Sequence, residues 1–118
     1  MGEHFSKRER AVLRNLAAEA HDHELQEALT DLYEEFCSWG GDGISAFDLN
    51  DKIHEFHNGI SRELYKTYVL SDPELAVSIG IFRKIINLDD LDKDLREKLE
   101  PMVEGFERMS EAENNDAT

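Results

Sequence analysis

The stretch Gly40-Gly41-Asp42-Gly43-Ile44-Ser45-Ala46-Phe47-Asp48 decides how this chain folds. It is the one cluster of turn formers inside a chain otherwise rich in helix formers, and glycine adopts a positive φ at no steric cost. Ser45 and Asp48 have the spacing of a helix N-cap and an acidic residue three positions later, so a new helix is expected at once. The stretch predicts helix, tight turn, helix, with Ile44 packed into the core at the corner.

The residues before the turn predict one long helix. Ser6 and Glu9 form a capping box, so this helix is expected to begin there and to run toward Trp39. Its apolar residues form two stripes that change phase at His21-Asp22-His23, where no glycine or proline interrupts the chain. We therefore expect a continuous or slightly kinked helix. The stripes are Leu13, Leu16, Ala17 and Ala20, and then Leu25, Leu29, Leu32, Phe36 and Trp39.

Two further helices are predicted directly after the turn. The apolar stripe of the second helix stays in phase through Gly59, so this helix is expected to reach Val69. The signal Ser71-Asp72-Pro73-Glu74 then starts a third helix over residues 74–87. This third helix is apolar almost all round, which predicts burial on two sides.

The chain is predicted to form one all-α domain with a tail. A last helix is expected to begin near Asp89-Asp90 and to kink or split at Pro101. Residues 1–109 are expected to form a compact bundle of four to five helices, whose long first two helices are antiparallel across the glycine-rich turn. Residues 110–118 are acidic and lack apolar periodicity, which predicts a disordered tail.

Charge and cysteine content limit the classes of function. The formal net charge is −14, which opposes binding to nucleic acid or to an anionic membrane. Cys37 is the single cysteine, so no intrachain disulfide can form and a reducing, cytoplasmic location is expected. The sequence shows neither the apolar run of a signal peptide nor a stretch typical of a transmembrane helix.

Two pairs of histidines are candidates for a metal site. His21 and His23 flank the phase change in the first helix, and His54 and His57 lie one turn apart on the second. If these helices are antiparallel, the two pairs lie at similar heights, where nearby carboxylates would complete a ligand set for a divalent metal. This is the hypothesis of a metal-binding or hydrolytic helical bundle. The alternative is that the histidines are polar residues at the border of the core.

The segment Arg14-Asn15-Leu16-Ala17-Ala18-Glu19-Ala20-His21 resembles the Arg-polar-x(n)-His pattern of HEPN-type helical ribonucleases. The resemblance covers these eight residues. It implies a ribonuclease in which Arg14 stabilises phosphate charge and His21 transfers a proton. The two residues are seven positions apart, so they lie on the same face of a helix.

These features predict a small acidic helical protein that acts as a protein–protein interaction or regulatory module. Its partner is expected to be a protein, such as one encoded by a co-transcribed gene, and neither a nucleic acid nor a membrane. A homodimer is expected as well, because the third helix and the phase change both indicate surplus apolar surface. No catalytic residue, cofactor or metal ligand is assigned, and an enzymatic role is not favoured. The metal-binding bundle and the HEPN-like ribonuclease are the two alternatives.

Overall fold

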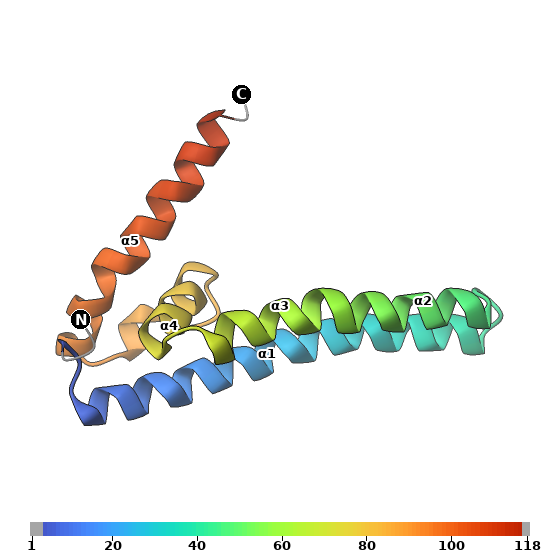
Figure 1. The fold of residues 1–118 in the computed structure, drawn as a ribbon, viewed down its shortest axis with the longest axis horizontal. Helices are drawn as coiled ribbons and strands as arrows, with labels where there is room; N and C mark the ends of the chain where they lie inside the picture. The colour runs from blue at the N-terminus through green and yellow to red at the C-terminus, as the bar shows by residue number, and fades with distance from the viewer. Residues whose placement is uncertain (1–3, 117–118) are drawn as a thin grey trace.

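The computed structural model describes residues 4–116 of the chain. Every regular element in that range is a helix, which confirms the all-α prediction (Figure 1). None of these helices combines the length and the apolar content needed to cross a lipid bilayer. In chain order the elements are α1 (Lys7–Gly40), α2 (Ala46–Phe56), the π-helical η2 (His57–Ser61), α3 (Arg62–Tyr65), the π-helical η3 (Lys66–Leu70), α4 (Pro73–Phe82), the 3-10 helix η4 (Leu88–Asp90) and α5 (Lys93–Asp116).

The molecule is elongated, contrary to the compact bundle expected from the sequence. Its Cα radius of gyration is 17.8 Å and its principal extents are 54 × 40 × 23 Å. A compact chain of this length has a radius of gyration of about 13.5 Å. Figure 1 shows the reason: the helical hairpin of α1 with α2 and α3 reaches far beyond α4, and α5 points away from the hairpin.

Helix α1 is one unbroken helix, as predicted. Ser6 Oγ accepts a hydrogen bond from Glu9 N at 3.0 Å, and Glu9 Oε1 accepts one from Ser6 N at 2.9 Å, so the capping box is complete. The phase change near residue 21 reflects two different neighbours of the same helix. The buried residues Leu13, Ala17 and Ala20 belong to the core. In the later stripe, Leu25 still packs against the core, whereas Leu32 lines a pocket with Phe56 of the second helix.

The turn after Gly40 folds back onto the last residues of α1. Gly43 N donates a hydrogen bond to Ser38 O at 2.7 Å. The residue with positive φ is Asp42, at 65°, so the expectation that a glycine supplies this conformation is wrong. Position 43 needs glycine for a different reason, which is that the backbone there lies very close to Ser38. A Cβ at this position would touch Ser38 Oγ and lie 3.0 Å from Ser38 O.

The second helix begins behind this turn as predicted. Ser45 Oγ accepts a hydrogen bond from Asp48 N at 3.1 Å. From Ala46 the chain stays helical to Leu70, with π-helical turns at η2 and η3. Ile44, just before the cap, is half-buried and lies outside the core cluster. The prediction that it packs into the core is therefore wrong, since only two helices meet at this end.

Helix α4 ends five residues earlier than the predicted 74–87 helix, at Phe82. Lys84 takes a positive φ of 64°, and the amides of Ile85 and Ile86 donate to Gly80 O at 2.9 and 3.1 Å. Ile86 Cδ1 packs so close to Gly80 that a Cβ at that position would lie 2.7 Å from it. The apolar residues after Phe82 therefore belong to a loop folded back onto α4, and not to a helix.

The last helix, α5, begins later than predicted and is not split. Asp92 Oδ1 accepts a hydrogen bond from Leu95 N at 3.1 Å, and α5 starts at Lys93 rather than at Asp89-Asp90. Pro101 lies inside the helix. Helix α5 continues to Asp116, so residues 110–116 of the expected tail are helical, while residues 117–118 lie outside the described range.

The core lies where the first half of α1 meets η3, α4 and the first half of α5. Leu13, Leu64, Leu95 and Leu99 are among its fully buried side chains. Beyond the core, residues 21–63 form what we call the hairpin arm. Within this arm only Leu49 is buried, so its two helices have no third layer over them.

Candidate functional site

The register of the hairpin decides which side chains face one another. Close to the core, Tyr68 stacks on His21, with ring centroids 5.8 Å apart and ring planes inclined by 19°. Further out along the hairpin, Leu32 of α1 and Phe56 of α2 line one pocket together. These two pairs define an antiparallel register in which residue 57 lies opposite residue 31 or 32.

The four histidines of the candidate metal site are therefore not brought together. His54 and His57 lie roughly 15 Å along the helix axis from His21 and His23, at 1.5 Å per residue. The expectation that the pairs lie at similar heights is wrong, and His23 Nε2 instead lies 3.2 Å from Glu27 Oε1. Among the described residues, no group of three or more His, Cys, Asp or Glu side chains could hold a metal ion.

Arg14 and His21 lie on the same side of α1, as their spacing predicts. They line one pocket of about 320 Å³, together with Tyr68 and Ser71. The seven-residue spacing thus places a guanidinium and an imidazole on the same side of α1, beside the end of η3. The catalytic roles that the ribonuclease resemblance implies for them stay a prediction.

A hydrogen-bonded group ties the hairpin to the end of α4. Glu24 Oε2 accepts hydrogen bonds from Tyr68 Oη and from Arg83 Nη1, the second at 2.8 Å. Burial of Tyr68, together with its bond to Glu24, raises the pKa of this phenol far above its ordinary range. The sequence did not predict this group, because its members come from three separate elements.

A second polar contact joins the start of α1 to α5. Lys98 Nζ lies 2.6 Å from Glu9 Oε1, with the two side chains 26% and 14% exposed. The hydrogen bond from Lys98, followed by the one from the Ser6 amide, lowers the pKa of the Glu9 carboxyl. Glu9 thus serves both the cap of α1 and the packing of α5.

On α1, apolar and charged side chains of the hairpin arm lie on opposite sides of the seam. At about 100° per residue, Leu29 and Phe36 are rotated from the seam residue Leu32 by roughly 60° and 40° in one sense. Asp31 and Glu35 are rotated by roughly 100° and 60° in the other sense. Leu29 and Phe36 remain 45% and 41% exposed although they flank the seam.

The same division holds on α2. Ile53 is rotated from Phe56 by roughly 60° in the first sense, whereas Lys52 and Glu55 are rotated by roughly 40° and 100° in the other. In an antiparallel pair, equal senses of rotation lead to the same side of the hairpin. Lys52 and Glu55 accordingly line one pocket with the charged residues of α1, Asp31 and Glu35.

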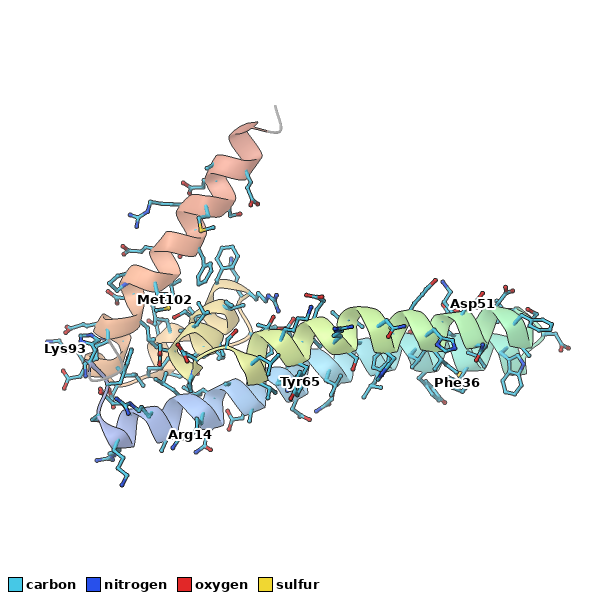
Figure 2. All side chains as sticks on the ribbon, in the orientation of Figure 1. Arg14, Phe36, Asp51, Tyr65, Lys93 and Met102 are labelled. Carbon is cyan, nitrogen blue, oxygen red and sulfur yellow. The ribbon has the colours of Figure 1, made fainter. Side chains whose placement is uncertain are left out.

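We call the exposed apolar side chains on the other side of the hairpin arm the open face. It comprises Leu29, Tyr33, Phe36 and Ile53, whose exposed fractions run from 37% for Ile53 to 66% for Tyr33. Figure 2 shows Phe36 and Asp51 at opposite edges of the arm. The open face is one part of the apolar surface that the arm leaves uncovered, since Trp39, Phe47 and Ile60 are exposed as well.

A groove of about 540 Å³ lies between the first half of α1 and the chain that follows α4. Three carboxylates, from Glu19, Asp90 and Asp92, line it together with His23 and Asn87. We call it the acid-rimmed groove. Its remaining lining is apolar: Val12, Leu16, Ala20, Ile85, Ile86, Leu91 and Leu95.

No protein-family model matches this chain, and neither does any curated protein or solved structure with which it was compared. The open face and the acid-rimmed groove are two surfaces that the fold leaves accessible to solvent. Both consist of side chains whose exposure and chemistry are given by the fold.

Proposed function

We propose that this protein is a helical interaction module that self-associates through the open face of its hairpin arm. The observation that supports the proposal most strongly is that Leu49 is the only buried side chain among residues 21–63. An amphipathic helix gains its stability mainly from packing its apolar face. Two helices that bury so little against each other gain more by packing against a second pair.

The chemistry of the hairpin arm favours a second copy of this chain as the partner. Each chain carries a net charge of −14, so contact through the charged side would bring carboxylates together. The open face carries no charged residue among its four members, Leu29, Tyr33, Phe36 and Ile53. Two open faces related by a twofold axis can therefore pack as a four-helix bundle while the acidic sides remain in water.

The side of the hairpin arm that carries the open face is large enough for a stable dimer. About twenty residues of each helix extend roughly 30 Å, and two helices side by side are roughly 20 Å wide. This footprint is about 600 Å² on each copy, or about 1,200 Å² in total, which exceeds the roughly 1,000 Å² expected of a specific interface.

The wider role that we infer is binding or regulation of a protein partner in the cytoplasm. The net charge of −14 disfavours nucleic acid and anionic membranes as ligands, and the single Cys37 suits a reducing compartment. An interaction module of this kind needs neither a cofactor nor a catalytic residue.

The single cysteine provides the experiment. Cys37 is exposed and lies one residue beyond Phe36, so a spin label there reports on the hairpin arm without removal of other cysteines. Double electron–electron resonance should give one defined distance between two labelled copies. Phe36→Glu should abolish it, and Met109→Glu, at a 61% exposed site on α5, should leave it unchanged. The absence of any intermolecular distance in the unsubstituted protein would contradict the proposal.

A further inference from the structure

The acid-rimmed groove is separate from the open face. It is formed by the first half of α1 and by residues 85–95, whereas the open face belongs to the outer part of the hairpin. Its volume of about 540 Å³ falls within the range of about 300–1,000 Å³ found for ligand pockets. Binding in the groove therefore does not require self-association.

The floor of the groove is apolar and held in place by the fold. Ile86 packs on Gly80, and the amides of Ile85 and Ile86 donate to Gly80 O at 2.9 and 3.1 Å. Leu91 and Leu95 are 8% and 2% exposed, so their side chains are fixed by the core below. A floor of this kind is suited to accept an apolar side chain of a ligand.

The rim of the groove is acidic. Glu19, Asp90 and Asp92 line it, and no Lys or Arg occurs among the described lining residues. The ion pairs between described side chains include neither Glu19 nor Asp90. The Asp92 carboxylate is held in place, because its Oδ1 accepts a hydrogen bond from Leu95 N at 3.1 Å.

We propose that the acid-rimmed groove binds a short cationic, amphipathic segment of a partner protein. The segment inserts an apolar side chain between Leu16, Ile86 and Leu91 and places lysine or arginine side chains against Glu19, Asp90 and Asp92. Charge complementarity selects this partner. An acidic segment would bring like charges next to the carboxylates, and a neutral segment would remove water from them without a compensating charge. The net charge of −14 adds long-range attraction for such a segment.

The probe for this proposal is a short fluorescein-labelled peptide of lysine and leucine whose leucines share one helical face. Fluorescence anisotropy should show saturable binding that weakens with salt. The double variant Glu19→Gln/Asp90→Asn should weaken binding at least about fivefold. The matched control Glu34→Gln/Asp51→Asn removes the same charge from the hairpin arm and should leave the affinity unchanged.

Two further measurements distinguish binding in the groove from attraction of a cationic peptide to the acidic surface as a whole. Val12→Lys, at a 40% exposed site on the edge of the groove, should weaken binding, and Val12→Glu should not. A peptide with serine in place of leucine should bind much more weakly than the probe. The proposal is overturned if the control double variant weakens binding as much as the groove variant, or if the serine peptide binds as well as the leucine peptide. Repeating the titration with Phe36→Glu shows that the result does not depend on self-association.

Discussion

Glu24 and Arg83 lie 59 residues apart in the sequence, yet Arg83 Nη1 donates a hydrogen bond of 2.8 Å to Glu24 Oε2. The same carboxylate oxygen accepts the hydroxyl of Tyr68. Glu24 thus connects α1, η3 and Arg83, the residue that follows α4. The connection lies where the hairpin arm leaves the core, so it holds the arm at its angle to the rest of the molecule.

Replacing Glu24 should destabilise the protein more than replacing other glutamates of α1. Glu24→Ala leaves the hydroxyl of Tyr68, a 6% exposed residue, without its acceptor, which costs about 1–3 kcal/mol. Glu27→Ala removes only the exposed contact with His23 and should cost less than about 0.5 kcal/mol. Urea denaturation of both variants measures the difference, and equal stabilities would show that the connection is not important to the fold.

The raised pKa of Tyr68 predicts a loss of stability at alkaline pH. The unfolded chain releases the phenolic proton of Tyr68 near pH 10, whereas the folded protein retains it. The contribution of Tyr68 to the free energy of unfolding is therefore complete below about pH 10 and declines by about 1.4 kcal/mol per pH unit above it. Tyr68→Phe cannot show this decline. The difference in unfolding free energy between the two proteins should therefore shrink above pH 10, and a constant difference would contradict the prediction.

The contact between Glu9 and Lys98 predicts the opposite pH dependence. Because the pKa of Glu9 is lowered in the fold, its contribution is present above the ordinary pKa of a glutamate and disappears as the pH falls through the lowered value. Lys98→Met should cost about 1 kcal/mol at neutral pH and clearly less at an acidic pH below the lowered pKa of Glu9. Lys93→Met, which removes an exposed contact of 4.0 Å with Glu97, is the control and should have little effect at either pH.

Gly43 and Gly40 should respond differently to alanine. A Cβ at Gly43 would touch Ser38 Oγ and lie 3.0 Å from Ser38 O, so Gly43→Ala should destabilise by about 1–2 kcal/mol. At Gly40, within α1, no atom lies within 4 Å of an added Cβ, and Gly40→Ala should stabilise by about 0.5–1 kcal/mol. Chemical denaturation decides the point, and a Gly43→Ala protein as stable as Gly40→Ala would refute the close-approach explanation.

The features that the sequence predicted correctly are local ones. The caps at Ser6 and Ser45 depend on residues three positions away, so spacing alone reveals them. The end of α4 could not be predicted in this way, because the loop after Phe82 is stabilised by the packing of Ile86 on Gly80. The apolar pattern continues through that loop because Ile85, Ile86 and Leu88 pack against the core.

The candidate sites show the same limit. Arg14 and His21 share a pocket because their spacing on a single helix is enough to place them together. The heights of the histidine pairs depended on the register between two helices, which the sequence alone does not determine. Helix periodicity likewise predicted surplus apolar surface, from the third helix and from the phase change in the first. The structure shows exposed apolar side chains on the hairpin arm, which includes the second half of α1, whereas no large apolar side chain of α4 is exposed.

Sedimentation velocity at micromolar concentration tests the central claim, self-association through the open face, most directly. The unsubstituted protein should sediment as a dimer, with twice the chain mass of 13.6 kDa. The dimer should strengthen from about 0.05 M to about 0.5 M salt as repulsion between the acidic chains is screened. Phe36→Glu/Ile53→Glu should give a folded monomer, and Met109→Glu should remain a dimer. A 13.6 kDa species for the unsubstituted protein at every concentration and salt level would contradict the claim.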